Sequence, residues 1–360
     1  MAGDEGDADG ECGEALTLFA KRSRLYPIFV REGRSRKRYK SGYINRNGDT
    51  VVKPTYDHAY PFREGLSSIR LGDLWGAVDV LGSLAIKPFS ESPLAFTEVL
   101  SSFSTKGRDG LVNTAGEITL PAQYQHIGYF SGGLACVHAK DGYGFIDANG
   151  RFVIPPFFED ARGFSEGLAA VKMSEGWGYI GPGGHTVIPA RFKCESGMAG
   201  PFREGLARVA RNDKWGHINK SGEFVTPPVF DMALEFCEGF APVRTGNRYG
   251  FVNTAGELTI PTIYHDVGRF SEGVARVNVA TGEAHKSIAD ACETGFINQA
   301  GQFVLKPKFF SAGNFQDGLC LVETEKHLGY VDVQGNYIWQ SGWAEIGSLD
   351  PLHLFPPERS

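Results

Sequence analysis

The chain has 360 residues, 42% of them hydrophobic and 22% charged, a composition that excludes an intrinsically disordered protein. The formal net charge is −6, and six acidic but no basic residues lie in residues 1–14. Removing these six from the 42 acidic residues leaves 36, equal to the 36 Lys and Arg, so the body of the chain has no overall attraction to nucleic acid or membrane.

Residues 1–24 are predicted to form an acidic tail without the apolar core of a signal peptide. No run approaches the 18 or so apolar residues of a membrane helix. The cysteines form no C-x-x-C pair and are too sparse for a disulfide framework, so we expect reduced thiols in a cytoplasmic protein without membrane contact. They are Cys12, Cys136, Cys194, Cys237, Cys292 and Cys320.

A basic segment follows the tail. It contains Arg34, Arg36, Lys37 and Arg38, in the first hairpin turn of the array described next. One interpretation is a solvated hairpin that pairs with the acidic tail. The other is a docking patch for an anionic partner, either nucleic acid or an acidic protein segment. Nucleic acid is the weaker choice, because Tyr39 is the one stacking aromatic nearby.

From residue 42 onward the sequence repeats. A Gly followed by Ile or Val two residues later recurs nine times, mostly in steps of 34 residues, and a second Gly follows each by six residues. The first column is Gly42, Gly76, Gly110, Gly144, Gly178, Gly216, Gly250, Gly295 and Gly329. Such periodicity predicts a tandem array of small structural units.

Each repeat reads as three short strands. In residues 168–205, the apolar segments 168–171, 177–180 and 186–189 are separated by turns, which predicts an antiparallel meander. Eight of the nine copies have Asp or Asn three residues before the closing Gly, the pattern of a type I turn. Both faces of the strands are apolar, so neighbouring repeats should pack against each other.

A Phe-x-Glu-Gly motif joins successive repeats. We expect its Phe to cap the core between repeats, its Gly to permit a tight turn, and its acid to accept hydrogen bonds from turn amides. The alternative is that the acids form a ladder that binds a basic ligand. The acids are Glu64, Glu98, Glu166, Glu204, Glu238, Glu272 and Asp317.

Two steps are longer than 34 residues and locate insertions. The larger, around residues 280–291, contains Glu283, His285 and Lys286, which are polar and able to reach a partner. Because loops on rigid scaffolds carry binding, these residues and the basic segment are the candidate partner-binding sites.

The motifs resemble the WG-repeat family, also called KWG repeats, with nine copies over about residues 25–340. The closest copies are Trp75-Gly76, Trp177-Gly178 and Trp215-Gly216. The resemblance is incomplete, since six copies replace the Trp. It implies a repeat scaffold and brings no catalytic residues. No metal-ligand spacing, nucleophile elbow or phosphate-binding loop is present, so we expect no enzyme activity, metal or cofactor.

The predicted fold is all-β: nine three-stranded meanders in a curved or superhelical stack, or alternatively in a closed propeller-like ring. The array spans residues 25–343, before a C-terminal tail of residues 344–360. Its units are 25–65, 66–99, 100–133, 134–167, 168–205, 206–239, 240–273, 274–318 and 319–343. The predicted function is a non-catalytic scaffold that binds a protein or peptide. The alternative is an enzyme that acts on a polymer such as a glycan laid along the array.

Overall fold

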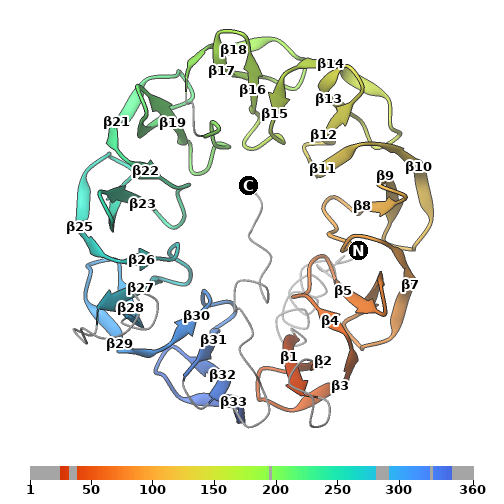
Figure 1. Ribbon diagram of the computed structural model, residues 1–360, viewed down its shortest axis with the longest axis vertical. Coiled ribbons are helices and arrows are strands. Elements are labelled where there is room, and N and C mark those ends of the chain that lie inside the picture. The colour runs from red at the N-terminus through yellow and green to blue at the C-terminus, as the bar shows by residue number, and fades with distance from the viewer. Residues whose placement is uncertain (1–24, 32–38, 194–196, 281–291, 325–326, 343–360) are drawn as a thin grey trace, which may run out of the picture. The chain divides into compact units, whose positions relative to one another are not determined.

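Figure 1 shows the computed structural model of the protein, which describes residues 25–31, 39–193, 197–280, 292–324 and 327–342. The described residues form β-strands and turns and contain no α-helix, which confirms the all-β fold. The chain divides into two compact bodies, each considered by itself. They are the N-terminal body, Met1–Leu94, and the C-terminal body, Ala95–Ser360.

The N-terminal body contains two antiparallel sheets in its described residues, with strand orders β1-β2-β3 and β4-β5-β6-β7. The strands are β1 (Tyr26–Arg31), β2 (Tyr39–Ile44), β3 (Thr50–Tyr56), β4 (His58–Ala59), β5 (Leu66–Leu71), β6 (Leu74–Asp79) and β7 (Leu84–Ser90).

The C-terminal body contains seven sheets in its described residues, and every sheet pairs strands that are consecutive in sequence. Its three-stranded sheets are β8 (Leu100–Thr105), β9 (Arg108–Asn113) and β10 (Ile118–Tyr124), and β19 (Ala207–Arg211), β20 (Lys214–Ile218) and β21 (Phe224–Phe230).

The other five sheets of this body have four strands. They are β11 (His126–Ser131), β12 (Leu134–Ala139), β13 (Gly142–Ile146) and β14 (Phe152–Phe158); β15 (Asp160–Ala161), β16 (Ala169–Met173), β17 (Gly176–Ile180) and β18 (Thr186–Phe192); β22 (Met232–Ala233), β23 (Phe240–Thr245), β24 (Arg248–Asn253) and β25 (Leu258–Tyr264); β26 (Asp266–Val267), β27 (Val274–Ala280), β28 (Cys292–Asn298) and β29 (Phe303–Phe309); and β30 (Ser311–Ala312), β31 (Leu319–Glu323), β32 (His327–Asp332) and β33 (Tyr337–Gly342).

The predicted meander is present in each described sheet, but six of the nine add a fourth strand at its start. The added strand runs back along the first meander strand. In five sheets it has two residues and precedes the Phe-x-Glu-Gly motif, and in the sixth it is the six-residue strand β11. In β15, for example, Asp160 pairs with Lys172 and Ala161 with Val171. A two-residue strand has too few positions to show an alternating pattern, so the sequence could not predict it.

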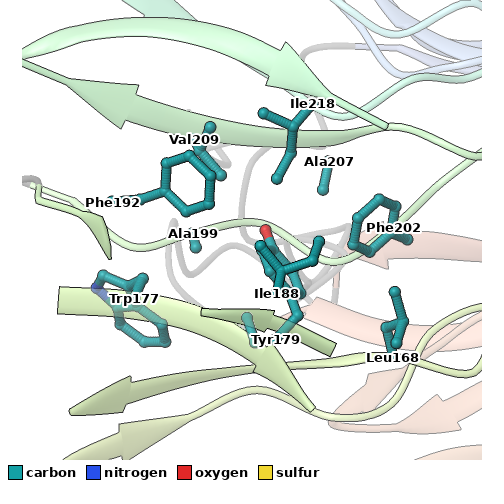
Figure 2. Packing of buried hydrophobic residues seen from close by; sticks show 11 residues of the cluster. Leu168, Trp177, Tyr179, Ile188, Phe192, Ala199, Phe202, Ala207, Val209 and Ile218 are labelled. Carbon is teal, nitrogen blue, oxygen red and sulfur yellow. The ribbon is translucent and has the colours of Figure 1, made fainter. Parts of the chain in front are cut away.

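Within the C-terminal body the sheets follow one another along an arc, with the short strands inside and the outer strands, such as β14 and β18, outside (Figure 1). In this body the arrangement is therefore that of the propeller-like alternative. The core lies between neighbouring sheets (Figure 2). Trp177 and Tyr179 from one sheet pack with Phe202 and Val209 of the next, and all four are buried. Stacking thus buries faces that a single sheet would leave in water.

The first Gly of each repeat is required by a close approach of the backbone. A Cβ built on Gly216 would lie 2.4 Å from the carbonyl oxygen of Thr226 in the adjacent outer strand. A Cβ at any of the other eight glycines of this column would likewise lie 2.4–2.8 Å from a carbonyl oxygen of the outer strand. The second Gly has a different role, since it closes the Asx turn with positive φ, as at Gly222 (82°).

Candidate binding surface at the Phe-x-Glu-Gly turns

The partner-binding residues predicted from the sequence lie outside the described residues. They are Arg34, Arg36, Lys37, Arg38, Glu283, His285 and Lys286. Their role stays a prediction. The other candidate, the acidic column of the Phe-x-Glu-Gly motif, is described by the structure.

Each of these motifs forms a two-residue hairpin turn. In the C-terminal body, Arg203 and Leu206 exchange backbone hydrogen bonds of 2.8 and 3.0 Å. Between them, Glu204 and Gly205 have φ angles of 53° and 78°. Two successive positive φ angles are typical of a type I′ turn, which favours Asn and Gly. A Glu in the left-handed region costs on the order of 1 kcal/mol, so an interaction of its side chain is expected to offset this cost.

The glutamate carboxylate contributes a link to the next repeat. Glu204 Oε2 accepts a hydrogen bond of 2.8 Å from the amide of Gly239. Glu238 accepts two, from the amides of Glu272 at 2.6 Å and Gly273 at 2.8 Å. The same link joins Glu98 to Gly132, Glu166 to Gly205, and Glu272 to Gly318. Five of the seven acids therefore accept hydrogen bonds from turn amides, as the sequence predicted.

Some of these turns carry a second link, at the residue between Phe and Glu. The hydroxyl of Ser165 donates a 2.6 Å hydrogen bond to the carbonyl oxygen of Phe202, and that of Ser271 does the same to Phe315. Successive repeats are thus fixed to each other at their turns, which gives the row of glutamates a defined spacing.

Lys220 shows that the same turns also accept a cation. Lys220 is the second residue of the Asx turn between β20 and β21, in the sheet that follows the one with the Glu166 turn. Its Nζ lies 3.0 Å from the backbone carbonyl oxygen of Glu166 and 3.2 Å from Glu166 Oε2. We call this pair of acceptors on one turn glutamate an ammonium seat. At Glu238, Gln299 Nε2 donates a 3.3 Å hydrogen bond to the equivalent carbonyl oxygen.

Two further glutamates offer the same acceptors. The position of Lys220 is Thr254 in the sheet after the one with the Glu204 turn, and Val333 in the sheet after the one with the Glu272 turn. Neither side chain carries an amine or amide. Both glutamates are exposed, and within the described residues neither backbone carbonyl oxygen accepts a hydrogen bond. These two ammonium seats are therefore accessible to a side chain from outside the chain.

The opposite end of the sheets carries an ion pair, which gives a role to the Lys of the motif Lys214-Trp215-Gly216. Lys214 Nζ lies 2.5 Å from Asp231 Oδ1, and Asp231 Oδ2 accepts a 2.6 Å hydrogen bond from the amide of Gly246. The hydrogen bond from Lys214 is the main reason that the pKa of Asp231 lies below its usual value. In the N-terminal body, Lys40, Asp57 and Gly72 repeat this arrangement.

A buried polar cluster lies where sheet β19–β21 meets sheet β22–β25. Arg208 Nε donates a 2.8 Å hydrogen bond to Glu235 Oε1, and its guanidinium lies 5.0 Å from the ring centre of Trp215. Burial alone would raise the pKa of Glu235, but Arg208 holds it below its usual value. Burial also lowers the pKa of His217 to about 4, so this imidazole is neutral at pH 7.

Among the described residues, no three His, Cys, Asp or Glu side chains are grouped so that they could hold a metal ion. The part of the chain that the structure describes has no helix long and apolar enough to cross a membrane. Cys136 and Cys320 are buried free thiols, and burial raises the pKa of Cys136 to about 12.

Sequence reasoning identified the acidic column but missed the ammonium seats. A seat is made by the carbonyl and carboxylate oxygens of one turn, and its occupant comes from the following sheet. Lys220 is 54 residues away from Glu166 in sequence. Aligning the Asx turns would have given one signal. Lys220 stands in a column that otherwise contains Arg46, Val80, Thr114, Ala148, Pro182, Thr254, Gln299 and Val333.

Comparisons with known proteins agree with this description. A family model described as "WG containing repeat" matches residues 42–75, 110–141, 143–176, 177–215, 215–249, 249–280 and 295–326. No curated protein matches the chain in sequence.

Of three similar solved structures, the first shows a shared fold. A crystal structure of "the eukaryotic initiation factor" has a TM-score of 0.64 and 11% identity, over 90% of this chain and 97% of that one. The dihydro-heme d1 dehydrogenase NirN has a TM-score of 0.46 and 12% identity, over 95% and 75% of the two chains. AztD from Citrobacter koseri has a TM-score of 0.42 and 11% identity, over 89% and 95%. At such low identity the first likeness concerns the fold alone.

Proposed function

The chain belongs to the WG-repeat family, and we propose that it is a non-catalytic scaffold that binds a protein or peptide partner. In this proposal the partner is a basic segment, and its lysines occupy the ammonium seats at Glu204 and Glu272. The observation that carries this proposal is Lys220, whose ammonium group contacts both acceptors of Glu166. The chain itself thus supplies an example of the interaction that a partner would make.

The chemistry of the seat favours lysine over other side chains. A carboxylate supplies charge and the adjacent carbonyl supplies a second acceptor, while an ammonium group has three donors and can serve both. Because an exposed ion pair contributes only about 0.2–1 kcal/mol, a single seat would bind weakly. Two or more seats held at a fixed spacing can act together on one peptide.

The test uses the full chain and a library of short peptides that differ only in carrying lysine or glutamine at chosen positions. We expect the lysine peptides to bind, more weakly as salt is raised. The variants Glu204→Gln and Glu272→Gln should weaken binding, because Gln keeps an oxygen for the amides of Gly239 and Gly318 but removes the charge. Glu257→Gln, at an exposed glutamate of an Asx turn, is the matched control.

Equal binding of the lysine and glutamine peptides, or unchanged binding in both glutamate variants, would overturn the basic-partner proposal. The alternatives make different predictions. Salt-sensitive binding of nucleic acid or an acidic peptide would favour the basic segment at Arg34–Arg38 instead. Cleavage of a glycan by the purified chain would favour the enzyme alternative.

A further inference from the structure

One pair of opposed core residues is polar in a single sheet and apolar or aromatic in the others. In sheet β19–β21, His217 lies directly opposite Thr226 in the ladder between the second and third meander strands. Both side chains are fully buried. In the other sheets the same two positions are apolar or aromatic. Those pairs are Tyr43 and Val52, Ala77 and Ile86, Leu111 and Leu120, Phe145 and Ile154, Tyr179 and Ile188, Phe251 and Ile260, Phe296 and Leu305, and Tyr330 and Trp339.

One polar atom of this pair has a clear role. His217 Nε2 lies 2.9 Å from the backbone carbonyl oxygen of Leu234. Tyr179 makes the matching contact one repeat earlier, where its hydroxyl donates a 2.9 Å hydrogen bond to the carbonyl oxygen of Gly200. A carbonyl can only accept, so Nε2 carries the hydrogen. His217 is neutral, and its Nδ1 is therefore an acceptor.

The two remaining polar atoms have no partner in the described residues. His217 Nδ1 and Thr226 Oγ1 are both buried and make no hydrogen bond there. Leaving such an atom unsatisfied costs about 1–3 kcal/mol. Residues directly opposite each other in a ladder project to the same side of the sheet, so the hydroxyl donor and the Nδ1 acceptor share one region of the core.

His217 and Thr226 are smaller than Tyr179 and Ile188, which occupy the same positions in the preceding sheet, so this pair fills less of the core than that one. Buried waters occupy such polar sites and bond to groups that would otherwise be unsatisfied. We infer that Thr226 and His217 hold one buried water molecule, which accepts a hydrogen bond from the Thr226 hydroxyl and donates one to His217 Nδ1.

A high-resolution crystal structure of the full chain tests this inference directly. We expect density for a water about 2.7–3.2 Å from both atoms. In solution, the same water should give an NOE to the Thr226 methyl group. No water density at this place, or a direct hydrogen bond between Thr226 Oγ1 and His217 Nδ1, would overturn the inference.

Stability measurements give a second test. Thr226→Val and His217→Tyr each remove one side of the water site, and each should lower the melting temperature. The double variant with His217→Tyr and Thr226→Ile restores the pair found in sheet β15–β18. It should melt above both single variants, because the Tyr hydroxyl can bond the Leu234 carbonyl, as Tyr179 bonds Gly200, and no buried polar atom is then left without a partner. A double variant whose loss equals the sum of the single losses would contradict a shared water.

Discussion

Arg208 Nε donates a 2.8 Å hydrogen bond to Glu235 Oε1 across the junction of two neighbouring sheets, where both side chains are mostly buried. The pair joins β19 to the segment after β22. A buried ion pair stabilises a fold only while both partners are present, since a lone buried charge is costly.

The first prediction concerns this pair. Glu235→Ala should reduce the free energy of unfolding by about 3 kcal/mol, because it leaves Arg208 without its carboxylate. The pKa of Glu235 is lowered in the folded state, so its contribution is present above pH 4.5 and lost as the pH falls through the folded value. Urea unfolding of both proteins over this pH range measures the effect. Equal midpoints at pH 7 would contradict it.

His217 gives a second pH dependence. Its pKa is about 6.5 unfolded and about 4 folded, so the unfolded state binds the proton more readily. Stability should therefore fall as the pH drops from 6.5 to 4, by about 3 kcal/mol from this group. His217→Tyr should abolish that part of the pH dependence. If the variant and the parent lose stability in parallel, His217 is not the group responsible.

Trp215 is predicted to anchor the junction between repeats. It is 7% exposed and packs with Phe230, Phe236 and Val243 of that junction. Trp215→Ala should cost about 3–5 kcal/mol, because it creates a cavity in the core. Calorimetry measures the loss. A melting temperature equal to that of the parent would place this column outside the core.

The Gly of the Phe-x-Glu-Gly motif and the first Gly of the repeat are predicted to respond differently to alanine. At Gly205 a Cβ would contact nothing within 4 Å, so Gly205→Ala should cost only about 1–2 kcal/mol for its φ of 78°. At Gly216 a Cβ would lie 2.4 Å from the Thr226 carbonyl oxygen, so Gly216→Ala should cost clearly more. Chemical denaturation of the two variants compares them, and the reverse order would contradict the close approach.

The repeat spacing was sufficient to predict the three meander strands of each sheet and the turns between them. It identified the Asx turns, whose Asn219 side chain accepts hydrogen bonds from the amides of Ser221 and Glu223. These features depend on residues close together in sequence, and each is repeated many times.

Features that join distant segments or occur in only a few repeats could not be predicted. The link from Lys214 to Asp231, the seat of Lys220 on Glu166, and the opposed pair of His217 and Thr226 each join segments that are distant in sequence or occur in few repeats. The positive φ of Glu204 was also unexpected, because glutamate rarely adopts it unless its side chain gains a contact.

The most direct test of the proposed function is a gain of binding in Lys220→Ala. This variant removes the ammonium group that occupies the seat at Glu166 and leaves both acceptors accessible. The measurement is the affinity of the full-length variant and parent for a peptide with several lysines, at low and at high salt. We predict tighter binding by Lys220→Ala at low salt, and loss of that gain when Glu166→Gln is added. Equal or weaker binding by Lys220→Ala, in a protein that melts like the parent, would contradict the proposal that these turns bind lysine side chains.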